Sequence, residues 1–161
     1  MPAKSETFLL KYSYTSTDSE TGITSTVNEE GVGISYPVTT TGFDEVLTAN
    51  SDPVRGDGYY GRADGFHTAQ INLSDFVGII RIQGSLDVDP EDSDWFTVQL
   101  GTGNRSVDTT GLIREENITQ VEYIEEKTGT NSYNFTGNYV WLRVKIEDWT
   151  AGTIDSIYLN H

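Results

Sequence analysis

The 161-residue sequence contains no cysteine, only two histidines and a single methionine. The absence of cysteine excludes disulfide bonds and thiolate metal sites. No apolar run approaches the length of about 20 residues that a membrane-spanning helix needs. The first eight residues show no basic segment followed by a long apolar run, so we expect no signal peptide. These absences predict a soluble protein that does not follow a classical secretory route and does not contact a membrane.

Basic residues are also scarce. Ten lysines and arginines stand against 25 aspartates and glutamates, which gives a formal net charge of −15. A surface this acidic repels phosphate backbones, so we expect no direct binding to nucleic acid. The acids are densest between residues 85 and 126, and we interpret that region as a solvated face that keeps the protein soluble.

Strand patterns dominate what is present, and no long window shows helical periodicity. The clearest strand is 139–146, where Val140, Leu142, Val144 and Ile146 alternate with polar or aromatic residues. Further strands are predicted at 8–14, 31–38, 66–73, 76–82, 95–100 and 152–159. Turn residues recur about every ten residues, at 50–53, 64–65, 89–90, 101–104, 129–131 and 136–138. This spacing predicts an all-β fold, an antiparallel β-sandwich of jelly-roll-like form.

The segment between residues 115 and 127 is the one place where helix formers gather. We interpret 119–125 as a strand, with 122–124 paired to 132–134 around a turn at Gly129. A short helix in this segment is the alternative.

A change in pattern near residue 50 predicts two parts. Residues 1–50 are rich in Thr and Ser and weakly patterned, and we expect an N-terminal arm or edge strands that pack on the main body or on a neighbouring copy. Residues 51–161 carry the regular strands and form the β-sandwich domain.

No catalytic site can be assembled from the sequence. Nucleophilic catalysis requires a base beside the nucleophile, and the only histidines are His67, within a strand pattern, and His161, the last residue. No nucleophile elbow, zinc-protease motif or phosphate loop is present. We expect a protein that is not an enzyme.

The densest group of oxygen ligands lies at 87–94. Asp87, Asp89, Asp92 and Asp94 alternate at the end of a strand, and Ca²⁺ takes six to eight such oxygens. The segment does not follow the EF-hand pattern. A polar turn is therefore the main interpretation and a calcium site the alternative, with no other cofactor expected.

Aromatic residues offer a second kind of site. Tyr59, Tyr60, Trp95 and Trp141 could form a platform on which sugar rings stack, beside Asn, Asp and Gln side chains. The alternative is that these rings fill the sandwich or an interface between copies.

Several phrases resemble the virion structural proteins of tailed marine and cyanobacterial phages. They are 61–78 (GRADGFHTAQINLSDFVG), 80–86 (IRIQGSL), 92–96 (DSDWF), 133–144 (YNFTGNYVWLRV) and 150–154 (TAGTI). The resemblance spans residues 59–161 and implies a β-sandwich in the neck, tail, baseplate, fibre or capsid decoration of the particle. It implies a homo-oligomer that contacts other virion proteins, and it supplies no catalytic residues.

Three functional hypotheses follow. The first is a structural component of a tailed-phage virion, synthesised in the host cytoplasm and acting through protein–protein assembly. The second is a module that recognises a carbohydrate, such as a glycan on the host surface. The third is a polysaccharide depolymerase.

Overall fold

A computed structural model describes residues 5–17, 20–37, 46–61, 65–107, 113–118 and 121–160. In these ranges the chain forms β-strands and one short 3₁₀ helix, η1 (Asp92–Asp94), and contains no α-helix. The strands are β1 (Ser5–Thr7), β2 (Leu10–Thr17), β3 (Thr24–Gly31), β4 (Ile34–Ser35), β5 (Leu47–Ser51), β6 (Val54–Arg55), β7 (Phe66–Ser85), β8 (Phe96–Thr97), β9 (Leu100–Val107), β10 (Ile113–Ile118), β11 (Val121–Thr136) and β12 (Trp141–Asn160). None of these ranges contains a helix with the length and apolar character that crossing a membrane would take.

The strands belong to one hydrogen-bonded sheet. Its main path is β10–β9–β11–β7–β12–β5–β2–β3, and the short strands β1, β4, β6 and β8 pair with β12 or β7. All the pairings are antiparallel. The central pair is β7 with β12, which runs from Trp141 opposite Ser85 to Asn160 opposite Thr68.

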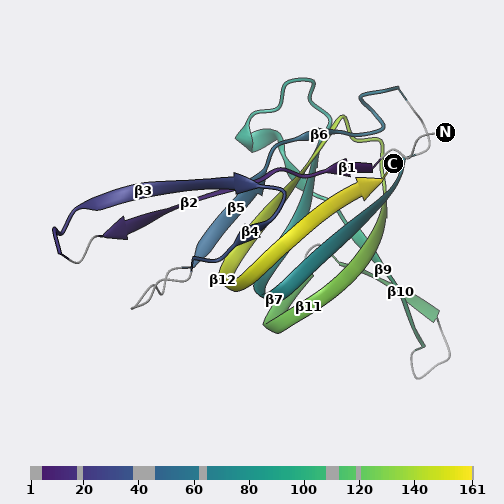
Figure 1. The fold of residues 1–161 in the computed structure, drawn as a ribbon. Helices are drawn as coiled ribbons and strands as arrows, with labels where there is room; N and C mark the ends of the chain where they lie inside the picture. The colour runs from purple at the N-terminus through teal and green to yellow at the C-terminus, as the bar shows by residue number, and fades with distance from the viewer. Residues whose placement is uncertain are drawn as a thin grey trace.

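The three longest strands bend in the middle, which turns the single sheet into two layers. Figure 1 shows β7, β11 and β12 turning back at the same end of the molecule, so each gives one half to each layer. The bends coincide with shifts of register, between Glu147 and Thr153 in β12 and between Tyr123 and Gly129 in β11. Bulges of this kind bend a strand and increase its twist.

Backbone conformation at the bend requires glycine. Gly152 has a φ of +84°, and a Cβ placed on it would lie 2.1 Å from the carbonyl oxygen of Asp75 on β7. Only a residue without a side chain tolerates both conditions. Asp75 and Asp148 also lie in the left-handed region, with φ of 53° and 50°. The backbone conformation at the bend therefore depends on glycine at position 152.

The core lies between the two layers. Leu142, Val144 and Ile146 from one half of β12 are completely buried, as are Ile154 and Ile157 from the other half. The two halves of β7 contribute a matching set, namely Ala69, Ile71, Leu73, Phe76, Ile80 and Ile82. The predicted fold class, an all-β antiparallel β-sandwich of jelly-roll-like form, is confirmed by the strand content, the pairing and the layers.

Strands from the first 50 residues join the same sheet. β1, β4 and β5 pair with β12, and β2 pairs with β5. Phe8 and Leu10 are completely buried. Trp149 of β12 is also completely buried and packs against Tyr12 and Tyr36, with ring centroids 5.0 and 5.7 Å apart. Beyond these contacts, the β2–β3 hairpin extends away from the two layers (Figure 1).

The strand interpretation of the segment after residue 115 is confirmed for 121–125, whereas 119–120 lie outside the described residues. The predicted hairpin around Gly129 is wrong. Residues 121–136 form one strand, with Glu122 opposite Ile79 and Ser132 opposite Gln70. Gly129 marks a shift of register within this strand, because a bulge uses the same permissive residues as a turn.

Other boundaries also differ from the prediction. The predicted turn at 101–104 is wrong, because these residues belong to β9. The strands predicted at 66–73 and 76–82 are one continuous strand, β7, and those predicted at 139–146 and 152–159 are one continuous strand, β12. In these cases a local break in the alternation marks a bend or a bulge and not a chain reversal.

Candidate functional site

The outer face of β12 carries the candidate site. Trp141, Arg143 and Lys145 alternate with Leu142 and Val144, which point into the core. Because successive side chains of a strand point to opposite faces, the three larger side chains form a row on the outside of the layer.

Arg143 is the most firmly held member of this row. Its Nε donates a hydrogen bond of 2.8 Å to Gln83 Oε1, and its Nη1 lies 3.6 Å from Asp92 Oδ1. The guanidinium stacks on Trp95, with Cζ 4.5 Å from the ring centroid. Its side chain is only 16% exposed. An arginine has five N–H donors in a rigid plane, so the terminal nitrogens keep donors in a fixed position for a ligand.

A groove of about 700 Å³ opens beside Arg143 and Asp92. Its other walls come from β2, β3, β5 and the residue after β5, through Lys11, Tyr12, Ser13, Asn28, Glu29, Glu30, Thr48, Asn50, Ser51 and Asp52. The volume falls within the range of about 300–1,000 Å³ usual for small-molecule sites.

Lys11 is fixed on the side of the groove away from Arg143. Its Nζ lies 2.8 Å from Asp52 Oδ1 and 3.7 Å from Glu30 Oε2. The hydrogen bond to Asp52 raises the pKa of Lys11 above its ordinary value of 10.5. The strand register places Asn50 directly opposite Lys11 on one side and opposite Lys145 on the other. An amide thus lies between two cations on the same face.

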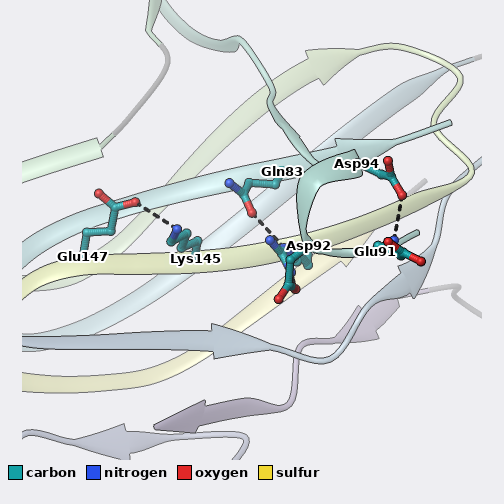
Figure 2. Close-up of polar contacts among 7 residues, drawn as sticks. Gln83, Glu91, Asp92, Asp94, Lys145 and Glu147 are labelled. Atoms are coloured by element: carbon teal, nitrogen blue, oxygen red, sulfur yellow. Dashed lines mark hydrogen bonds and ion pairs between the residues drawn. The ribbon is translucent and has the colours of Figure 1, made fainter. Parts of the chain in front are cut away.

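The charges along this face are paired. Figure 2 shows Lys145 directed at Glu147, at 3.6 Å. Glu147 also lies 3.5 Å from Arg81 Nε. With the Lys11 and Arg143 pairs, Lys11, Arg81, Arg143 and Lys145 each have a carboxylate within 4 Å. The face therefore presents ordered donors and acceptors with little local excess charge, although the chain carries −15.

An aromatic cluster adjoins the row. The ring of Tyr59 lies 5.5 Å from Tyr60 and 5.2 Å from Trp141, and Arg55 lies 4.5 Å above Tyr59. Trp141 Nε1 donates a 3.0 Å hydrogen bond to the carbonyl oxygen of Val88, which orients its ring. Tyr59 and Tyr60 are 42% and 44% exposed. The structure thus brings Tyr59, Tyr60 and Trp141 together, at one end of the row that continues through Arg143.

Trp95, the fourth predicted aromatic residue, contacts an arginine side chain. Trp95 lies against the guanidinium of Arg143, and Arg143 follows Trp141 by two residues in β12. The Trp95 ring thus fixes the orientation of the Arg143 guanidinium.

The acidic loop contains Asp87, Asp89, Asp92 and Asp94. Figure 2 shows Asp94 accepting a hydrogen bond from the backbone N–H of Glu91, at 2.8 Å, which closes η1. Asp92 faces Arg143, and the backbone N–H of Asp87 donates to Ser85 Oγ. Across the described residues, no group of three or more histidine, cysteine or acidic side chains is placed to hold a metal ion. The calcium alternative stays a prediction.

Of the two histidines, His67 is buried. Its Nδ1 lies 3.1 Å from the carbonyl oxygen of Gly65, and its ring stacks on Phe135 at 4.9 Å. His161 lies outside the described residues.

Sequence reasoning missed Arg143, Gln83 and Lys11, which contribute most of the polar geometry. Gln83 and Arg143 become neighbours only through the β7–β12 register, and Lys11 approaches Asp52 only through β2–β5 pairing. One signal was available, because Trp141, Arg143 and Lys145 alternate with apolar residues in the cleanest strand of the sequence.

The chain matches no model of a protein family and shows no significant similarity to a curated protein. Two solved structures share parts of its chain course. One holds the CBM22-1 and GH10 modules of endo-1,4-β-D-xylanase 10B from Clostridium thermocellum, complexed with xylohexaose. The two sequences are 10% identical, the match covers 94% of this chain and 24% of that chain, and the TM-score is 0.32. The other is a carbohydrate-binding module of the β-sandwich superfamily. The two sequences are 11% identical, the match covers 98% of this chain and 84% of that chain, and the TM-score is 0.35. The chain thus spans about a quarter of the xylanase chain.

Proposed function

We propose that this protein is a carbohydrate-binding module whose site is the groove on the outer face of β12, β5 and β2. The observation that carries the proposal is the fixed position of Arg143, held by Gln83, Asp92 and Trp95 at the wall of an open groove. A sugar presents hydroxyls that both donate and accept hydrogen bonds, and the paired guanidinium, ammonium, amide and carboxylate groups of this face supply both kinds of partner.

The aromatic cluster complements these polar groups. Tyr59 and Tyr60 expose ring surface beside the half-buried Trp141 at the end of the same row. The apolar face of a sugar ring stacks on such surfaces, while its hydroxyls reach the polar side chains beside them. Together they fit an oligosaccharide that lies across the face, with one ring on the aromatic residues and further units in the groove.

The paired charges also bear on the class of sugar. Lys11, Arg81, Arg143 and Lys145 each have a carboxylate within 4 Å, so acids of the chain already match these four positive charges. We expect neutral oligosaccharides to bind better than uronic-acid or sulfated chains, because an anionic chain would also be repelled by the net charge of −15.

The test is a titration with a panel of soluble oligosaccharides, followed by NMR chemical shifts and calorimetry. We expect shifts at Arg143 and its neighbours. The substitution Arg143→Ala should weaken binding by about tenfold or more, as loss of charge-assisted hydrogen bonds implies. Trp95→Ala and Tyr60→Ala should also reduce it. Lys127→Ala, which removes a cation from β11, is the matched control and should bind as the wild type does. Silence across a broad panel would overturn the proposal.

A second candidate is the structural role in a phage particle that the resemblance of residues 59–161 implies. The observation that favours an assembly role is the exposed edge of β3, which ends the strand order and pairs only with β2 among the described strands. Its direct test is to localise the protein on purified particles by cryo-electron microscopy. A glycan-binding face would be compatible with such a position, since a virion component that meets the host surface can use both.

A further inference from the structure

The strand β3 ends the sheet on one side. In the strand order it follows β2, and no other described strand hydrogen-bonds to it. A terminal strand presents a row of backbone N–H and carbonyl groups that can pair with another strand. Thr24, Ser25 and Thr26 are exposed, as are Asn28 and the two glutamates that follow it.

This edge lacks most features that discourage pairing. The β2–β3 register runs through eight consecutive residue pairs without a shift, whereas β7, β11 and β12 all carry bulges. The strand sequence TSTVNEEG contains no proline and no lysine, the residues that commonly block an edge. Figure 1 shows the hairpin extending from the body, which leaves room for a second chain.

We propose that β3 pairs with β3 of a second copy of this chain, antiparallel and around a two-fold axis at Val27. This register places Val27 opposite Val27, Glu29 opposite Ser25 and Glu30 opposite Thr24 of the other copy. Each glutamate then faces a hydroxyl group and not another carboxylate. A register centred at Glu29 would place like charges opposite each other, which is destabilising.

The two-fold axis has a consequence for the proposed site. Antiparallel pairing around an axis perpendicular to the sheet joins the two layers edge to edge and keeps their outer faces on the same side. Asn28, Glu29 and Glu30 line the groove, so the grooves of both copies would lie side by side. Two linked sites increase the apparent affinity for a long or clustered ligand.

The first experiment measures mass by light scattering during size exclusion over a series of protein concentrations. We expect a monomer–dimer equilibrium that shifts toward dimer with added salt, because each copy carries −15. The substitution Ser25→Glu should weaken the dimer about tenfold, since it places glutamates opposite each other twice. Adding Glu29→Lys to Ser25→Glu should restore it.

Thr15→Glu is the matched control, since it adds the same charge on β2, away from the edge. It should leave the dimer unchanged. A wild type that stays monomeric at every concentration and salt would overturn the proposal. Equal weakening by Ser25→Glu and Thr15→Glu, or no rescue by Glu29→Lys, would also contradict it.

Cross-linking gives an independent measurement. The chain contains no cysteine, so Val27→Cys introduces a single thiol at the proposed axis. Directly opposite cysteines on antiparallel strands lie close enough for a disulfide in the non-hydrogen-bonded pair. Mild oxidation should give a covalent dimer with Val27→Cys and much less with Thr15→Cys. Equal yields from the two variants would refute the register.

Discussion

The two faces of β12 differ in what they do, although they belong to the same strand. On the inner face, Leu142, Val144 and Ile146 are completely buried between the layers. On the outer face, Trp141, Arg143 and Lys145 are partly exposed, and they contact the carbonyl oxygen of Val88 and the side chains of Gln83 and Glu147. Alternation along one strand thus separates residues that stabilise the fold from residues that line the outer face.

Substitutions on the two faces of β12 should therefore change different properties of the protein. Inner-face residues stabilise by removing apolar surface from water, about 25 cal/mol per Å². Outer-face ion pairs are partly solvated, and pairs of this type contribute about 0–1 kcal/mol each. Changes inside should therefore lower the free energy of unfolding, whereas changes outside should alter binding while leaving stability nearly unchanged.

The largest decrease in the free energy of unfolding is expected for Trp149→Ala. Trp149 is completely buried, packs against Tyr12 and Tyr36, and donates its Nε1–H to the carbonyl oxygen of Ala151. Its truncation should lower the free energy of unfolding by about 3–5 kcal/mol. Denaturant melts followed by circular dichroism measure this. A loss below 1 kcal/mol would show that the contacts of Trp149 with Tyr12 and Tyr36 contribute little to stability.

A somewhat smaller loss is expected for Gly152→Ala at the bend. The added Cβ would meet the backbone of Asp75, and the φ of +84° disfavours any L side chain. We expect the free energy of unfolding to fall by about 2–3 kcal/mol. Gly129→Ala is a useful comparison, because Gly129 has a φ of +130° but no atom within 4 Å of the added Cβ. Equal losses in the two variants would assign the effect to backbone strain alone.

The junction between the hairpin and the core should be sensitive to high pH. Burial, helped by the carboxylate of Glu29, raises the pKa of Tyr12 from 10.0 to about 12. Burial also raises the pKa of Tyr139. Since the folded state holds the Tyr12 proton more tightly, the contribution of this residue is fully present below pH 10 and is lost as the pH rises through about 12. Unfolding measured across this range should show stability falling with pH, and less steeply in Tyr12→Phe. An unchanged slope in that variant would contradict the assignment.

The smallest effect is expected for Lys145→Ala on the outer face. Lys145 is partly exposed and pairs with Glu147, which Arg81 also approaches. Its loss should change the free energy of unfolding by about 0.5 kcal/mol or less. The same denaturant melts serve as the measurement, with Leu142→Ala as the inner-face counterpart that should cost about 2–5 kcal/mol. Comparable losses would break the distinction between the two faces.

Much of the fold could be predicted from residue patterns. Alternation placed Ala69, Ile71 and Leu73 on one face, and all three are buried. The irregular step from Ile154 to Ile157 was visible in the sequence, and a shift of register between Ile154 and Ser156 explains it. The bends could not be predicted, because a glycine at a bulge and a glycine at a turn give the same local pattern.

The candidate site was predicted only in part. Tyr59, Tyr60, Trp95 and Trp141 were identified from their residue type, and the structure brings three of them into contact while Trp95 lies against Arg143. The groove was not identified. It depends on Lys11, Asp52 and Arg143, which come from three segments far apart in the chain and meet only through strand pairing.

The amino-acid sequence by itself determined the strand character, the inward and outward faces and the acidic charge, because these follow from the period of two and from composition. The tertiary structure alone decided where the long strands bend, which strands become neighbours and which polar side chains share a face. The physical reason is that strand pairing joins residues through backbone hydrogen bonds that every sequence can make. The partners are therefore selected by the packing of the whole core and not by any local pattern.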